Sequence, residues 1–141
     1  MRSISPTEVR RKTILLEREM LKLPQVALPL FHHFLPGLYL RELHIPAGVI
    51  TTGKIHKYEC LNFLTKGERS TVIDGEIVRV KAPHFHISPA GSKRVSYTHQ
   101  DSVWITAHFT DETDVAKLEA ELVCDTEKQY IDFVRRIECH S

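Results

Sequence analysis

The chain has 141 residues, of which 42% are hydrophobic and 26% are charged, and its formal net charge is +1. This is the composition of an ordinary globular protein, which argues against wholesale disorder. The sequence contains no apolar run long enough for a transmembrane helix and no apolar core of a secretory signal near its start. The three cysteines are far apart and form no C-x-x-C pair, so we expect no disulfide framework, no cysteine zinc site and a cytoplasmic location.

Charge is distributed unevenly along the chain. Residues 1–22 carry six basic and three acidic side chains, a net charge of +3, whereas residues 111–141 carry four basic and nine acidic ones, a net charge of −5. Opposite charges predict an attraction between the two ends, within one chain or between subunits of a homo-oligomer. No basic run is interleaved with aromatic residues, so we expect no nucleic acid as a partner. Acidic residues are mixed among the basic ones of the N-terminal segment, so we expect no membrane partner either.

The first predicted element is an amphipathic helix over residues 5–23, within an N-terminal segment 1–24. The sequence S-P-T-E at residues 5–8 is a capping-box pattern with proline at the first helical position. Pro24 is expected to end the helix. A stripe then recurs at helical spacing, and it comprises Val9, Thr13, Leu16, Met20 and Leu23. We expect this stripe to pack against the rest of the chain or against a second copy.

Residues 25–110 have the pattern of short strands separated by turns. The strongest turn signal is Asp74-Gly75, because both residues tolerate the positive φ angles of a type I′ hairpin. Candidate strands lie near 38–45, 48–52, 57–65, 69–73, 76–81, 84–88, 93–98 and 102–109. Short strands at regular spacing with no helices between them predict a mainly β fold, an antiparallel sandwich or barrel.

Residues 111–141 are predicted to form a C-terminal helical extension of the same domain. Acidic residues fill the first turn of a helix over 111–123, where they suit the positive end of the helix dipole. Apolar residues at helical spacing predict a second helix over about 126–137.

Histidines are concentrated in the β region and mark four candidate sites. Alternation along a strand puts residues two apart on the same face, where two imidazoles can chelate a metal. The alternative is that these histidines are polar groups inside a barrel or on the solvated face of a strand. His99 near Asp101 could be a general-base pair or an ordinary loop hydrogen bond. The candidate groups are His56 with Tyr58, Cys60 and Asn62; His84 with His86; His99 with Asp101; and His32 with His33, which favours packing or an interface.

Gly48, His56 and Gly67, followed by P-A-G at residues 89–91, occur in an order that resembles the cupin family of small jelly-roll barrels. The resemblance implies an antiparallel jelly-roll barrel over residues 25–110. Cupins carry the motifs G-x5-H-x-H-x3–4-E-x6-G and G-x5-P-x-G-x2-H-x3-N, in which three histidines and a glutamate bind Fe, Mn, Ni or Zn.

The cupin ligand positions are only partly kept. His56 matches one of them, whereas Tyr58, Asn62 and Arg94 stand at the other three. The resemblance therefore implies a degenerate metal site, and we expect no metal cofactor. Arg94, Tyr58 and Asn62 become the candidate ligand-binding residues.

A narrower resemblance is to short cupin-like proteins encoded by tailed bacteriophages and prophages. It rests on residues 53–67, 89–104 and 112–123 and covers about residues 28–123. It implies a phage-encoded protein in the host cytoplasm or the virion, with a phage or host protein as a partner.

Three functions are consistent with these patterns. The first is a non-catalytic cupin-like binding or structural protein that forms a homo-oligomer. The second is a metal-dependent isomerase or oxygenase acting on a small polar substrate, with a divalent transition metal held by His56, Glu59 and His99. The third is a sensor that uses Arg94 to bind a carboxylate or phosphate, since guanidinium suits forked recognition of such anions.

Overall fold

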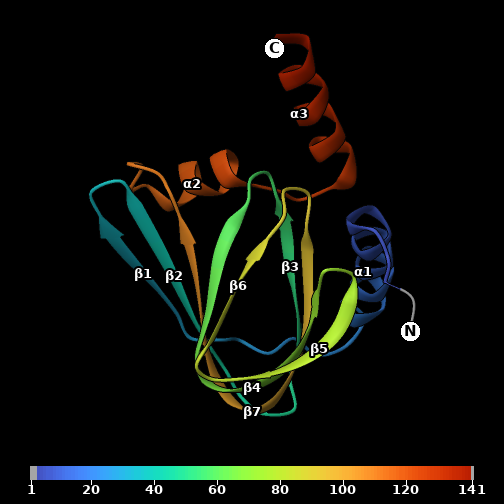
Figure 1. Cartoon of the computed structure of the whole chain (residues 1–141), viewed down its shortest axis with the longest axis vertical. Helices are drawn as coiled ribbons and strands as arrows, with labels where there is room; N and C mark the ends of the chain where they lie inside the picture. The colour runs from blue at the N-terminus through green and yellow to red at the C-terminus, as the bar shows by residue number, and fades with distance from the viewer. Residues whose placement is uncertain (1–2, 141) are drawn as a thin grey trace.

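The structure is a computed structural model that describes residues 3–140. Within these residues the strands form one curled antiparallel sheet, with a helix before it and helices after it (Figure 1). The helices are α1 (Pro6–Met20), α2 (Val115–Leu122) and α3 (Glu127–His140). The strands are β1 (Leu30–Leu35), β2 (Leu38–Ile45), β3 (Ile50–His56), β4 (Cys60–Ile73), β5 (Glu76–Lys81), β6 (His84–Ser88), β7 (Lys93–His108) and β8 (Val123–Cys124). The predicted mainly β, antiparallel, cupin-like architecture is confirmed.

Strand β7 is central to the sheet. Its residues 102–108 pair with β2, and its residues 93–97 pair with β3. On its other side it pairs with both halves of β4, which in turn pairs with β6 and β5. Both long strands bend in the middle, so the two halves of the sheet curl toward each other around an interior (Figure 1).

Two pairs of predicted strands are in fact single long strands. The predicted strands 57–65 and 69–73 join as β4, because Gly67 bends the strand instead of ending it. Gly67 has a φ of +91°, and a Cβ there would clash with Ser102 Oγ and the Asp101 carbonyl of β7. The β4–β7 register shifts around this glycine, as at a β-bulge. The last two predicted strands likewise join as β7.

The Asp74-Gly75 hairpin is confirmed, since both residues have positive φ angles of 51° and 80°. Strands β2, β5 and β6 have the predicted bounds. Strand β1 was not predicted, because most of its residues are exposed and show no alternation of polar and apolar side chains. It pairs with β2 at the edge of the sheet.

Helix α1 lies against β7 and β3. Only part of the predicted apolar stripe is buried in this contact. Thr13 is buried, whereas Leu16 and Leu23 are 40% and 64% exposed. The helix is held instead by polar side chains such as Glu17, which pairs with the buried Lys93 at 3.0 Å. Helical spacing locates the helix, but ion pairs with residues distant in sequence decide which side faces the sheet. A homo-oligomer formed through the stripe stays a prediction.

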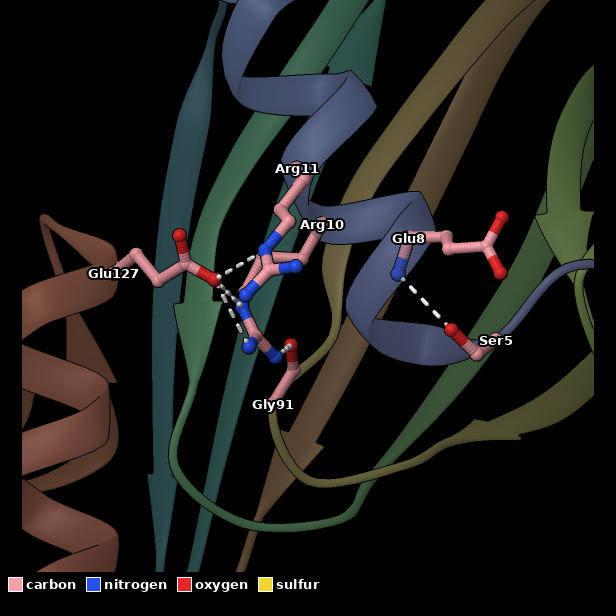
Figure 2. Close-up of polar contacts among 6 residues, drawn as sticks. All are labelled: Ser5, Glu8, Arg10, Arg11, Gly91 and Glu127. Atoms are coloured by element: carbon pink, nitrogen blue, oxygen red, sulfur yellow. Dashed lines mark hydrogen bonds and ion pairs between the residues drawn. The ribbon is translucent and has the colours of Figure 1, made fainter.

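The opposite charges of the two ends meet within one chain, where α1 contacts the start of α3 (Figure 2). Arg10 Nη2 and Arg11 Nε lie 3.2 and 3.3 Å from the same Glu127 oxygen, Oε1. Arg10 is buried, donates to the Gly91 carbonyl at 3.0 Å and places its guanidinium 4.9 Å from the Tyr130 ring centroid. This contact ties both terminal helices to the loop before β7.

Glu127→Ala is expected to lower the free energy of unfolding by about 1–3 kcal/mol, because it leaves the buried Arg10 without its charged acceptor. Lys128→Ala is the matched control. It removes an exposed i,i+4 pair with Asp132 at 3.3 Å, and its cost should stay below about 0.5 kcal/mol. Urea denaturation of both variants measures the difference, and equal losses would contradict the structural role of Glu127.

Helix α2 begins at Val115, later than predicted, because Asp114 caps it by accepting from the Lys117 backbone N–H at 3.2 Å. Its Leu118 and Leu122 pack against Tyr39 and close one end of the barrel. None of the helices in residues 3–140 has the length and apolar composition that a membrane crossing requires.

Candidate functional site

A cavity of about 800 Å³ lies between the two curled halves of the sheet. Side chains of β2, β3, β4 and β7 line its walls, and α2 borders it at one end. Part of the segment 20–30, which leads from the end of α1 into β1, also lines it. Because alternate residues of a strand face inward, the cavity receives side chains from strands that are far apart in sequence.

Arg94 is at the centre of a polar network in this cavity. Its Nη1 donates to Asn62 Oδ1 and, at 3.0 Å, to Thr106 Oγ1. Its Nη2 lies 3.1 Å from His56 Nε2, so that imidazole nitrogen is the acceptor. Asn62 is fully buried and its amide nitrogen donates to Ser88 Oγ at 2.8 Å, which fixes its orientation. Arg94 is thus held by neutral groups from three strands, β3, β4 and β7.

A second arginine, Arg69 of β4, is also held by neutral groups. Its Nε donates to Thr98 Oγ1 at 3.1 Å and its Nη2 to Thr51 Oγ1 at 2.6 Å. The guanidinium carbons of Arg69 and Arg94 lie 5.1 and 5.6 Å from the centroid of the buried Trp104 ring. Both distances are within the range of cation–π attraction, so Trp104 partly stabilises the two charges.

The electrostatics of the cavity are dominated by positive charge. Burial, followed by repulsion from Arg94 and Arg41, lowers the pKa of His108 to about 4. Burial is also the largest cause that holds the pKa of His56 well below its usual value, with Arg94 next. Burial lowers the pKa of Arg94 and Arg69 to about 10, so both stay charged at neutral pH.

This charge has little compensation inside the cavity. Glu119 is the one carboxylate among the described lining residues. It forms an ion pair with Lys54 Nζ at 3.2 Å, so its charge is already paired with a lysine. Arg41 of β2 lines the cavity, and its guanidinium makes no hydrogen bond or ion pair with any other residue in 3–139. The lining therefore presents a guanidinium that is free to bind an anion.

Three of the predicted site residues come together in the structure. His56, Asn62 and Arg94 form the network described above. Tyr58 does not join them, because it lies in the β3–β4 loop, is half exposed and packs edge-on against Phe133 of α3. The motif positions that lie on strands therefore meet in one network, whereas the loop position Tyr58 does not, and ligand binding by these residues stays a prediction.

The alternative metal ligands His56, Glu59 and His99 are not brought together. Glu59 is exposed in a loop, and His99 Nε2 lies 2.7 Å from Ser70 Oγ. Across the part of the chain that the structure describes, no three His, Cys, Asp or Glu side chains are grouped to hold a metal ion. Arg94 also engages the His56 nitrogen that a metal would need. The residues present do not fit a four-ligand cupin metal centre.

The other histidine groups have structural contacts. His84 and His86 lie on the inner face of β6, with ring centroids 5.4 Å apart, while Phe85 on the other face is exposed. The expectation of a solvated histidine face is therefore corrected. His32 lies 2.6 Å from the Tyr39 hydroxyl, and Asp101 accepts from the Ala47 backbone N–H instead of pairing with His99.

Sequence reasoning missed Arg41, Arg69, Trp104 and His108. Arg41 stands between Tyr39 and Leu43 at the inward positions of a correctly predicted strand, and this interruption of an apolar face was a usable signal. Arg69 lies on β4, and Trp104 and His108 lie on β7, and the bends of these two long strands bring the three side chains to the cavity.

Comparison with known structures identifies the fold. No family model matches the sequence, and no curated protein matches it. The structure of KdgF from Halomonas sp. is similar, with a TM-score of 0.54 and 15% identity over 65% of this chain and 87% of that one. A cupin superfamily protein from Desulfitobacterium hafniense gives 0.51 and 9% over 63% and 83%. The chain has a cupin fold. A salicylate 1,2-dioxygenase from Pseudaminobacter salicylatoxidans gives 0.53 and 16% over 82% of this chain and 34% of that one.

These neighbours correct the expectation of no metal cofactor. Cupin neighbours such as KdgF and the salicylate dioxygenase are metal-dependent, so the loss of motif residues was not a sound basis for excluding a metal. We derive no chemistry through a metal, because the lining residues of this cupin fold do not form the required donor set. The phage resemblance stays a prediction.

Proposed function

We propose that this protein is a binding protein whose barrel cavity holds a small organic molecule with a carboxylate or phosphate group. The observation that carries the proposal is Arg41, a cavity-lining guanidinium with no hydrogen-bonding or ionic partner among residues 3–139. This develops the anion-binding function that the sequence suggested for Arg94.

The cost of holding charge inside the barrel supports the proposal. A charge that leaves water is ordinarily paired with an opposite charge, because unpaired burial is expensive. Arg69 and Arg94 have only neutral hydrogen-bond acceptors, and Arg41 has none within the described chain. A bound anion would supply the missing negative charge.

The four groups Arg41, Arg94, His56 and His108 surround one space. All four line the cavity, and Arg94 Nη2 lies 3.1 Å from His56 Nε2. Arg41 can bind a carboxylate or phosphate with two parallel hydrogen bonds. The rings of His56 and His108 are stacked with centroids 5.7 Å apart, which keeps this wall of the space rigid.

The test is anion binding by wild type and an Arg41→Gln variant, measured by calorimetry and thermal shift with acetate, hexanoate, inorganic phosphate and hexyl phosphate. At least one of these anions should stabilise the wild type. Arg41→Gln should weaken that binding at least about tenfold, the effect of losing a charged hydrogen bond worth about 1.5–3 kcal/mol.

Arg79→Gln is the matched control, because it removes an exposed arginine that pairs with Glu68 at 2.7 Å and does not line the cavity. It should bind as the wild type does. Absence of binding by all four anions, or equal binding by the wild type and Arg41→Gln, would overturn the proposal.

Catalysis is not part of this proposal. The structural neighbours include named enzymes as well as proteins without a named activity, and a shared fold does not determine chemistry. The homo-oligomer and the phage or host partner stay separate predictions.

A further inference from the structure

We infer that the ligand is amphipathic: an anionic head bound by Arg41 and Arg94, attached to an apolar body that lies along the hydrocarbon side chains of the cavity. This inference rests on the proposed anion-binding function and specifies the class of molecule. It predicts that compact anions such as acetate and inorganic phosphate are poor ligands.

The size of the cavity is the first argument. Its volume of about 800 Å³ lies within the range of about 300–1,000 Å³ that is typical of pockets for drug-sized molecules. The charged groups occupy only part of its wall. A compact anion would contact the arginines and leave most of the cavity surface in contact with water.

The second argument is the chemistry of the remaining wall. Hydrocarbon side chains from the segment before β1, from β2 and from the start of β3 line the cavity beyond the arginines. They are Leu23, Val26, Leu28, Leu43, Val49 and Ile50. An apolar body placed against them would gain about 0.8 kcal/mol for each buried methylene group, which is about a threefold to fourfold gain in affinity.

The third argument is the exposure of the apolar lining residues. At the α2 end, Leu118 and Leu122 are buried against Tyr39. At the other end, Leu23 and Val26 line the cavity and are nevertheless 64% and 58% exposed. The apolar body would therefore extend from the arginines toward these two residues and cover them.

The segment that carries these residues, 21–29, lies outside the strands and packs against the core through Leu28. Pro29 accepts a hydrogen bond from the His44 backbone N–H at 3.0 Å. The Gln25 side chain donates back to the carbonyls of Met20 and Leu23, within the same stretch of chain. The Gln25 contacts are thus local to the segment that the apolar body would cover.

Calorimetry with matched pairs of probes tests the inference on the full chain. Hexanoate is compared with acetate, and hexyl phosphate with inorganic phosphate, so the two head groups are distinguished. In at least one pair the longer probe should bind at least about tenfold more tightly. 1-Hexanol, which lacks the charge, should bind at least about tenfold more weakly than the preferred hexyl anion.

Val26→Ser should reduce the affinity for the preferred hexyl anion severalfold without changing the affinity for its short counterpart. Ile77→Ser, at an exposed position on β5 outside the cavity, is the control and should bind both probes as the wild type does. Arg41-dependent binding with equal affinity for long and short anions would overturn this inference and leave the proposed function standing. Equal binding of hexanol and the hexyl anions, or binding independent of Arg41, would overturn both.

Discussion

Replacement of Trp104 by alanine is expected to lower the free energy of unfolding by about 3–5 kcal/mol, the usual cost of removing a large buried aromatic side chain. Trp104 is 3% exposed and packs in a core with Ile45, Leu64 and Val80. The change would also remove the ring face beside Arg69 and Arg94, so both guanidiniums would lose a favourable contact. Denaturant unfolding monitored by circular dichroism measures the loss.

Two variants make this test specific. Trp104→Phe keeps an aromatic face beside the arginines and should cost clearly less than Trp104→Ala. Ile77→Ala, at an exposed position, should change the stability by less than about 0.5 kcal/mol. A cost below about 1 kcal/mol for Trp104→Ala would show that the ring is not a core element.

Acidification from pH 6.5 toward pH 4 is expected to destabilise the protein strongly. Burial is the main cause that lowers the pKa of His108 and His86 to about 4 and that of His56 well below 6.5. Below pH 6.5 the unfolded chain therefore binds protons that the folded chain does not. The stability due to these neutral histidines is complete above pH 6.5 and is lost as the pH falls, by up to about 1.4 kcal/mol per pH unit for each histidine.

Denaturant unfolding at pH 7, 6 and 5, at constant ionic strength, measures this slope. His108→Phe keeps a flat ring between Tyr39 and His56 and removes one titrating group, so the slope should decrease. Ile77→Ala, at an exposed position without a titrating group, should leave the slope unchanged. A stability that does not change between pH 7 and pH 5 would contradict the prediction.

Much of the local structure could be predicted because its causes are local. The Ser5 side chain caps α1 as predicted, and Asp74-Gly75 forms the predicted hairpin. Strands β2, β5 and β6 were predicted with their observed bounds, because turn residues flank each of them. The interruptions at Gly67 and at residues 99–101 were interpreted as strand ends, since a bulge and a turn have similar sequence signals.

The candidate site could be predicted only in part, for a different physical reason. His56, Asn62 and Arg94 stand at motif positions on strands, and the structure brings them together. Arg69 and Trp104 lie on β4 and β7, whose bends depend on strand pairings between residues far apart in sequence, whereas Arg41 interrupts an apolar strand face and could have been found from the alternation.

The sequence by itself determined strands β2, β5 and β6, the principal hairpin, the cap of α1 and the cupin-like order of the turns, because spacing and turn chemistry act over a few residues. Only the tertiary structure decided that α1 is held by Arg10 and Glu17 and that three arginines share one cavity almost without carboxylates. Charges become costly only where folding removes water from them. That removal depends on the whole curled sheet, so no single segment of the sequence reveals it.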